Sequence, residues 1–247
     1  MRPTVLLFDI DGTLVNTGGA GRRSMTRAFR DVHGARGEGA LDFAFSGMTD
    51  RAIVRTGLAA LGHVASAEAE IDRVLATYLG HLADEVARSE AYRVLPGVTS
   101  VLAWAESLGR ERPGAIAIGL GTGNVRAGAY TKLARGALDA CFAFGGFGCD
   151  AEDRTELLRV GAGRGAGALG VAVEECRVVI IGDTPKDVSA ARGMGAECVA
   201  VGTGGFEPRA LLEIGAIRAF ATLEDEGVRE ALLPADSYSR TARASDV

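Results

Sequence analysis

After Pro96 the sequence alternates regularly between helical and strand patterns, and this alternation restricts the fold more than any other feature of the chain. Strand patterns fall at residues 115–120, 141–144, 177–181, 198–201 and 219–222, and helical ones at 98–108, 125–133, 154–169 and 185–194. Strands and helices in strict alternation build a parallel sheet with helices on both of its faces. The sequence therefore predicts an α/β fold around a doubly wound parallel sheet.

A separate strand pattern, TVLLF at residues 4–8, precedes this alternation. Its unbroken apolar run is typical of a central strand that is buried on both faces. Between this strand and the alternation, residues 16–90 have a helical pattern throughout, with apolar residues recurring on one face of each turn. The simplest organisation is a core made of residues 1–15 and 91–235, with residues 16–90 as an all-helical insertion. We expect the tail, residues 236–247, to be disordered.

Charge and hydropathy limit the partners of this chain. A formal net charge of −5 and a content of 47% hydrophobic and 24% charged residues describe a globular protein with no basic surface for nucleic acid or for an anionic membrane. The apolar run that ends at Phe8 is too short for a signal peptide or a membrane span. We therefore expect a cytoplasmic protein with a small molecule as its partner.

Two features that suggest a ligand have a simpler structural interpretation. The four cysteines, Cys141, Cys149, Cys176 and Cys198, lack the CxxC spacing of a zinc site, and we expect plain buried or semi-buried thiols. The stretch GAGRGAGALG at residues 161–170 superficially resembles a dinucleotide fingerprint, but it lies inside a helical pattern instead of following a strand. Neither feature indicates a metal or nucleotide site.

Carboxylates and hydroxyl groups follow three of the predicted strands. The motifs are DIDGT from Asp9 to Thr13, GTGN from Gly121 to Asn124, and GDTPKD from Gly182 to Asp187. In an open parallel sheet, ligands bind beyond the carboxyl ends of the strands, so the three motifs should converge. Crowded carboxylates repel one another unless a cation offsets their charge, and oxygen ligands suit a hard ion. The sequence therefore predicts a Mg²⁺ site.

The motifs DIDGTLV, GTGN and GDTPKD, in this order, resemble those of the haloacid dehalogenase-like hydrolase superfamily and, within it, the phosphoglycolate phosphatase-like branch. The resemblance spans nearly the whole chain. It implies a Rossmann-like core with a helical cap over the active site. It also implies a Mg²⁺-dependent phosphatase that hydrolyses a small phosphate monoester through an aspartyl-phosphate. The expected partner is a small phosphorylated metabolite, and the chain is expected to be a monomer or a homodimer.

The resemblance also assigns the catalytic roles. Asp9 is implied to attack phosphorus, and Asp11 to protonate the leaving oxygen and later to activate water. The metal ligands implied are the Asp9 carboxylate, the backbone carbonyl of Asp11, and Asp183, with Asp187 one step further from the ion. Thr122 and Arg154 are expected to be catalytic as well. Phosphate and substrate contacts are expected for Gly12, Thr13, Thr122, Gly123, Asn124, Arg154 and, from the cap, Thr49.

One cation of the family pattern has no direct counterpart here. Related sites use a lysine followed by a proline to hold the nucleophile and the phosphate, and this chain has no such pair. Arg154, which opens a predicted helix, is the preferred substitute because a guanidinium can bind phosphate with two hydrogen bonds. Lys186 is the weaker candidate. Lys132, in the middle of a predicted helix, is interpreted as a solvated surface residue.

The helical insertion offers further candidates, each with an ordinary alternative. The segment from Gly47 to Arg51 either closes over the site or simply starts a helix, with Asp50 as its N-cap. Arg22, Arg23 and Arg51 either bind the far end of the substrate or face solvent. The three histidines lack ligand spacing.

Three other functions remain open at this point. A phosphomutase of the same fold would share the nucleophile, and a non-catalytic phosphate-binding protein would retain an idle site. A receiver-like signalling domain would also gather aspartates at a sheet edge, but it needs neither Asp11 nor a large insertion. Phosphonatase chemistry requires a lysine in the insertion, and residues 16–90 contain none.

Overall fold

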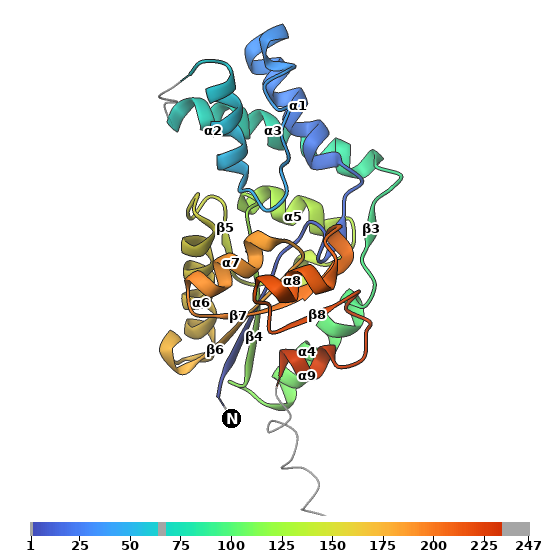
Figure 1. Cartoon of the computed structure of the whole chain (residues 1–247), viewed down its shortest axis with the longest axis vertical. Helices are drawn as coiled ribbons and strands as arrows, with labels where there is room; N and C mark the ends of the chain where they lie inside the picture. The colour runs from blue at the N-terminus through green and yellow to red at the C-terminus, as the bar shows by residue number, and fades with distance from the viewer. Residues whose placement is uncertain (1, 64–67, 234–247) are drawn as a thin grey trace, which may run out of the picture.

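The centre of the molecule is a six-stranded sheet (Figure 1) in a computed structural model that describes residues 2–63 and 68–233. The strand order is β5-β4-β1-β6-β7-β8, and every neighbouring pair is parallel. The strands are β1 (Thr4–Phe8), β4 (Ile116–Thr122), β5 (Gly145–Phe147), β6 (Arg177–Gly182), β7 (Glu197–Val201) and β8 (Arg218–Phe220). The first strand of the chain thus lies in the middle of the sheet.

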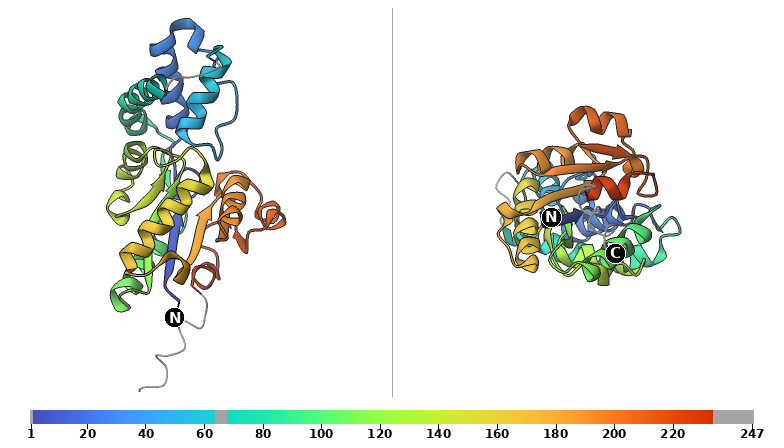
Figure 2. Two further views of the ribbon diagram at one scale, coloured as in Figure 1. Left: turned by 90° about the vertical axis from the view of Figure 1, so that its left-hand side faces the viewer. Right: turned by 90° about the horizontal axis from the view of Figure 1, so that it is seen from below.

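Helices cover both faces of this sheet (Figure 2). Leu6 and Phe8 of β1 pack into one apolar cluster with α4, α5 and α9, while Val5 and Leu7 pack into another with α6, α7 and α8. These helices are α4 (Val98–Glu111), α5 (Arg126–Ala134), α6 (Arg154–Leu169), α7 (Pro185–Gly193), α8 (Pro208–Ile214) and α9 (Val228–Leu232). Alternate side chains of β1 are therefore buried on opposite faces, and the predicted doubly wound α/β fold is confirmed.

Short 3-10 turns of this core are η2 (Asp139–Cys141), η3 (Val173–Glu175) and η4 (Gly202–Gly204). A further one, η1 (Gly34–Gly37), lies in the insertion at residues 16–90. In the described part of the chain, no helix is long and apolar enough to cross a membrane.

Three further helices form a layer beyond the carboxyl ends of the strands, at the top of Figure 1. They are α1 (Ala20–His33), α2 (Asp50–Ala60) and α3 (Glu68–Arg88), and they share an apolar cluster of their own. A two-stranded antiparallel ribbon, β2 (Val15–Asn16) with β3 (Arg93–Val94), connects this layer to the core. The ribbon lies where the predicted boundaries of residues 16–90 fall, and the division into two domains stays a prediction.

The prediction of a strand at residues 141–144 is wrong. Residues 139–141 form η2, and the edge strand β5 starts four residues later, at Gly145. Strand propensity pointed to Phe142 and Phe144, but both pack into the core outside the sheet. A Cβ on Gly146 would lie 1.8 Å from the carbonyl oxygen of Leu157 in α6, so only glycine allows this close approach.

Two other expectations need correction or lie outside the structure. Residues 16–90 are not helical throughout, because residues 38–49 form a loop that reaches down to the strand ends. Cys141 and Cys149 are exposed, whereas Cys176 and Cys198 are buried, and all four are free thiols. The predicted disordered tail, residues 236–247, lies outside the described residues.

The glycine-rich stretch from residue 161 to 170 is helical, as its pattern predicted. It lies in α6 and its C-cap, where Gly161 faces the backbone of Gly146 and Gly165 faces the side chain of Val5. These glycines let the helix lie against the sheet, which is a packing role.

Candidate active site

The site is built where three neighbouring strands end. In the register of the sheet, Phe8 of β1 lies opposite Leu120 of β4 and Ile181 of β6. The residues that follow each strand therefore arrive at one place, and the backbone N–H of Asp9 still donates to the carbonyl of Ile181 at 2.9 Å. The predicted convergence of the three motifs is present in the structure.

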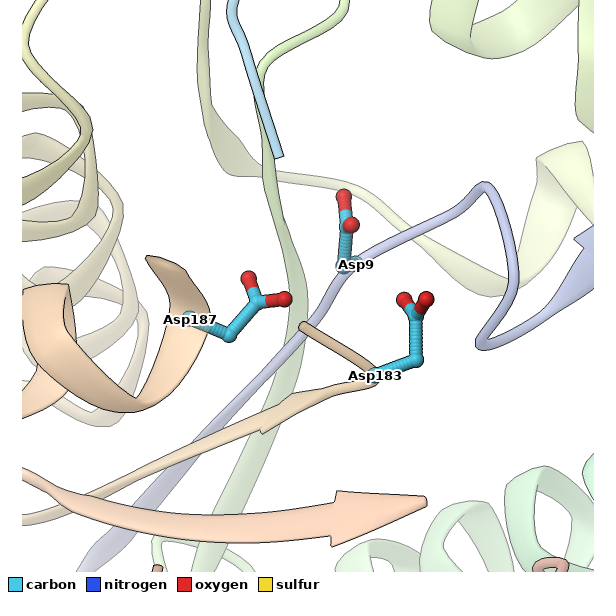
Figure 3. A group of neighbouring side chains, drawn as sticks. All are labelled: Asp9, Asp183 and Asp187. Carbon is cyan, nitrogen blue, oxygen red and sulfur yellow. The ribbon is translucent and has the colours of Figure 1, made fainter. Parts of the chain in front are cut away.

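Three carboxylates lie around one small space (Figure 3). Asp9 follows β1, Asp183 follows β6, and Asp187 lies in the first turn of α7, and one oxygen of each lies within 4.8 Å of the others. Burial raises the pKa of Asp9 to about 6, with Arg154 opposing the rise and Asp187 and Asp11 adding to it. Burial and the Asp187 and Asp9 charges raise the pKa of Asp183 well above its usual range. The cluster is electrostatically costly without a cation.

The third carboxylate of the cluster is already occupied by protein donors. Asp187 Oδ1 accepts from Nε and Nη2 of Arg154 at 2.9 and 2.5 Å, and Oδ2 accepts from the backbone N–H and the hydroxyl of Thr184 at 3.0 and 2.7 Å. Asp9 and Asp183 keep more free acceptor capacity. The expectation that Asp187 lies one step further from the ion than the direct ligands stays a prediction.

Arg154 lies inside the site, as the sequence predicted. It is the first residue of α6, it is buried, and its Nη2 lies 3.0 Å from Asp9 Oδ2. The helix starts here because Asp153 caps it, accepting from the N–H of Glu156 at 3.0 Å. Lys186, the weaker candidate, is exposed and does not line the cavity.

Lys132 is not a solvated surface residue, so that expectation is wrong. It is 4% exposed, and its Nζ lies 2.6 Å from Asp11 Oδ2 and 2.6 Å from Asn124 Oδ1. Position 132 shares the buried face of α5 with Ala129 and Leu133, at spacings of three and one. That periodicity was visible in the sequence, and it would have placed the lysine inward.

The second motif is held by hydrogen bonds within itself and to Asp11. Thr122 Oγ1 accepts from Asn124 Nδ2 at 2.8 Å, and the same amide donates to Asp11 Oδ2 at 2.9 Å. One oxygen of Asp11 therefore accepts hydrogen bonds from both a lysine and an amide, and the Asp11 side chain remains 43% exposed. Asp11 and Asp9, two residues apart, thus meet different surroundings.

Gly12 and Thr13 shape the side of the site that holds Asp183. Thr13 donates to Asp183 Oδ1 at 3.0 Å and does not line the cavity, so its hydroxyl positions an acid instead of facing a substrate. Gly12 has a φ of +85°, and a Cβ there would lie 2.5 Å from Asp183 Oδ2. Only glycine fits both the backbone conformation and the space.

Thr49 is near the site but is not part of its surface. Its hydroxyl caps α2 by accepting from the N–H of Ala52 at 3.2 Å and donates to the carbonyl of Glu152, also at 3.2 Å. Thr49 is 2% exposed and does not line the cavity. The structure thus does not place this residue where the predicted substrate contact requires it, and the N-cap role suggested for Asp50 belongs to Thr49.

Asp50 is a site residue that sequence reasoning missed. Its backbone N–H donates to the carbonyl of Gly123, and its Oδ2 accepts from the N–H of Val125, both at 2.8 Å. Burial raises the pKa of Asp50 to about 6, opposed mainly by the charge of Lys132. The helical layer is thereby bonded directly to the second motif.

A cavity of about 340 Å³ opens over the carboxylates and is walled by both layers. The core contributes Asp9, Asp11, Asn124, Lys132, Arg154 and Asp183, and the helical layer contributes apolar and polar side chains from α1, α2, α3 and the loop at residues 45–48. Of the three arginines considered, only Arg22 lines it, whereas Arg23 pairs with Glu85 and Arg51 with Asp72. The volume suits a small molecule.

Comparison with known proteins identifies a family. A model of the haloacid dehalogenase-like hydrolases matches residues 3–195. Among proteins with curated descriptions, none matches the sequence significantly.

Solved structures share the fold at low identity. CbbY from Rhodobacter sphaeroides, in complex with phosphate, is 19% identical, with a TM-score of 0.67 over 93% of this chain and 99% of that one. A β-phosphoglucomutase from Clostridium difficile is 18% identical, with a TM-score of 0.67 over 94% and 97%. A predicted phosphoglycolate phosphatase from Haemophilus somnus is 17% identical, with a TM-score of 0.62 over 91% and 96%.

Proposed function

Because the chain belongs to the haloacid dehalogenase-like hydrolase family, we propose that it is a magnesium-dependent phosphatase of a small phosphate monoester, similar to the phosphoglycolate phosphatases. The observation that carries this proposal is the pairing of Asp9 and Asp11. Asp9 is buried beside Arg154 and Asp183, whereas Asp11 reaches into the cavity beside Lys132 and Asn124. Two carboxylates in different surroundings can divide nucleophilic and acid–base work.

The residues present fit a Mg²⁺ ion. Asp9 and Asp183 are buried, they repel each other, and they offer only oxygen, which is the donor set that magnesium prefers. The backbone carbonyl of Asp11 is proposed as a further ligand, with Asp187 holding Arg154 behind them. When bound, Mg²⁺ would neutralise phosphate charge and so lessen the repulsion between phosphate and Asp9.

In the first step, an Asp9 carboxylate oxygen attacks the phosphorus of the bound ester. A bond forms from that oxygen to phosphorus, and the bond from phosphorus to the ester oxygen breaks with its electron pair on the leaving alcohol. Arg154 holds Asp9 in place, since its Nη2 is 3.0 Å from Oδ2. The same guanidinium can stabilise charge on the transferring phosphoryl group.

Asp11 is proposed to serve first as the acid and then as the base. Its proton passes to the leaving alcohol in the first step, and in the second it accepts a proton from the water that attacks the aspartyl-phosphate. Inorganic phosphate and free Asp9 result. Lys132 and Asn124 both bond to Oδ2 and therefore fix the orientation of this side chain.

The phosphate itself is proposed to rest on the second motif. Thr122 Oγ1 accepts from Asn124, which leaves its own hydroxyl hydrogen available for a phosphate oxygen. Gly12 and Gly123 line the cavity and allow the phosphate to approach the backbone. Loss of one such donor costs about 10²–10³-fold in rate in comparable sites.

The test is release of phosphate from p-nitrophenyl phosphate, measured with Mg²⁺ and with EDTA. Asp9→Asn should abolish release, and the matched surface variant Asp84→Asn, which removes an exposed carboxyl on α3, should not change it. Release that persists in Asp9→Asn would reject the nucleophile. No release by folded, magnesium-bound protein from any phosphate ester would favour a non-catalytic phosphate-binding protein.

Analysis of the products distinguishes a phosphomutase from a phosphatase. Given a sugar phosphate and its bisphosphate, a mutase interconverts positional isomers with little free phosphate, whereas a phosphatase releases stoichiometric phosphate. Accumulation of isomers without free phosphate would replace the proposed reaction with a transfer reaction.

A further inference from the structure

The wall that the helical layer adds to the cavity contains a tyrosine with an unused hydroxyl. Tyr78 of α3 is 1% exposed, and it lines the cavity between apolar neighbours that include Met25 and Ile53. Among the described residues, none forms a hydrogen bond with its hydroxyl, although the other buried or half-buried tyrosines are bonded. Tyr92 donates to the carbonyl of Lys132, and Tyr130 donates to that of Phe142.

This hydroxyl must face the cavity. Of the side-chain polar atoms that are fully buried in the described part of the protein, His33 Nε2 is the one without a hydrogen-bond partner. The Tyr78 hydroxyl, which also has no such partner, is therefore not fully buried. Tyr78 lines the cavity, so the exposed part of its side chain faces the cavity. Buried polar groups are paired in folded proteins with few exceptions, and one that faces a binding site is available to a ligand.

Tyr78 lines the same cavity as Asp50 and Asp11, so its hydroxyl shares the cavity with the proposed acid. Burial raises the pKa of the Tyr78 phenol well above its usual range, and the negative charges of Asp50 and Asp11 add to this rise. Asp11 is the group proposed to protonate the leaving oxygen. The Tyr78 hydroxyl therefore stays neutral and acts as a donor near the alcohol part of the substrate.

Asp50 supplies an acceptor in the same wall. It is 6% exposed and lines the cavity, and its Oδ2 accepts from the N–H of Val125. Within the described residues, Oδ1 has no protein donor. A carboxylate oxygen without a donor and a phenol without an acceptor thus share one wall of the cavity, which also holds Met25, Ile53 and Arg22.

We propose that Tyr78 and Asp50 form a subsite for a hydroxyl group on the alcohol part of the substrate, with Tyr78 donating to that hydroxyl and Asp50 Oδ1 accepting from it. A hydroxyl is the group that both accepts and donates, so it satisfies both partners at once. A carboxylate in this position, as in phosphoglycolate, would meet the negative charge of Asp50. The subsite rests on the proposed phosphatase function and narrows its substrates to phosphate esters of polyols.

The experiment compares glycerol 1-phosphate with n-propyl phosphate, which has the same chain without free hydroxyls. Native protein should prefer glycerol 1-phosphate in kcat/KM by about tenfold or more, because the deoxy compound leaves two buried groups unpaired. Tyr78→Phe keeps the ring and removes the hydroxyl, so it should lower kcat/KM for glycerol 1-phosphate roughly three- to tenfold. Its kcat/KM for n-propyl phosphate should fall less, so that the preference for glycerol 1-phosphate declines, and Asp50→Asn should reduce the preference in the same direction.

Tyr130→Phe is the matched control, since it removes a phenol that is bonded in the core away from the cavity. It should leave the preference unchanged. A preference that is undiminished in Tyr78→Phe would overturn the subsite, and so would phosphoglycolate as the better substrate of the native protein. If native protein with Mg²⁺ releases phosphate from p-nitrophenyl phosphate but from neither of these esters, the subsite fails and the phosphatase proposal stands. If it releases phosphate from none of the three, the phosphatase proposal itself fails.

Discussion

Lys132 and Asp11 form an ion pair in which Nζ and Oδ2 lie 2.6 Å apart, although 121 residues separate them in the sequence. Burial alone would lower the pKa of Lys132, but the charges of Asp11 and Asp50 outweigh burial and raise it. The lysine therefore remains a cation. Its second hydrogen bond, to Asn124 Oδ1, connects Asp11 to the motif from Gly121 to Asn124, which is proposed to bind the phosphate.

Replacement of Lys132 by methionine should lower phosphate release by roughly 10²-fold or more, because Asp11 loses the donor that orients it and gains freedom to turn away. The effect should appear in kcat rather than in KM. Lys186→Met is the matched control, since Lys186 is the other lysine of the chain and is exposed. Equal losses in the two variants would remove Lys132 from the mechanism.

Arg154→Met should abolish activity and also destabilise the fold. Removal of one partner from a buried charge cluster leaves Asp9 and Asp187 uncompensated, at a cost of roughly 3–5 kcal/mol. Urea unfolding in EDTA measures this loss. Arg159 lies further along the same helix and is exposed. Arg159→Met should therefore change the free energy of unfolding by less than about 1 kcal/mol. A stable but inactive Arg154→Met protein would contradict the proposed balance of charge.

Magnesium should stabilise the native protein through Asp183. At about 100 times its dissociation constant, a ligand that binds only the folded state adds roughly 2.7 kcal/mol to the free energy of unfolding. Asp183→Asn should abolish this gain in a thermal unfolding titration with Mg²⁺, and Asp84→Asn should retain it. A gain that survives in Asp183→Asn would place the ion elsewhere.

The burial of Asp50 predicts a pH dependence of stability. Its pKa is about 6 in the folded protein and 3.8 as the reference value, so the folded state holds the proton more tightly. This carboxyl therefore costs nothing below about pH 4 and destabilises the fold increasingly up to about pH 6, by roughly 3 kcal/mol at most. In EDTA, Asp50→Asn should lose less stability than native protein between pH 4 and pH 6. Parallel pH profiles of the two proteins would contradict this.

Gly123 should not tolerate a side chain. A Cβ at this position would lie 2.5 Å from the carbonyl oxygen of Met48, so Gly123→Ala should push the start of α2 away and raise KM. Gly163→Ala is the matched control, because its Cβ meets nothing within 4 Å on the outer face of α6. That change should stabilise the helix by about 0.5–1 kcal/mol. An unchanged KM in Gly123→Ala would show that the two layers are not tightly apposed during turnover.

Local sequence determined the elements whose signals repeat over several residues. The alternation after Pro96 predicted the parallel sheet, and the prediction of a helix over residues 154–169 coincides with α6. The three strand-end motifs predicted which carboxylates would meet, since parallel strands bring their carboxyl ends to one edge of a sheet. These features depend on the chain near each residue and on one rule of topology.

Only the tertiary structure decided the environment of single side chains. Whether Lys132 faces solvent or Asp11, whether Thr49 meets a substrate or caps α2, and whether Asp50 is an N-cap or a buried acid depend on how two layers of the molecule pack. The same holds for β5, where the close approach of α6 requires a glycine at position 146 that strand propensity does not predict. Burial and electrostatics act between residues far apart in the sequence, so a local pattern carries little information about them.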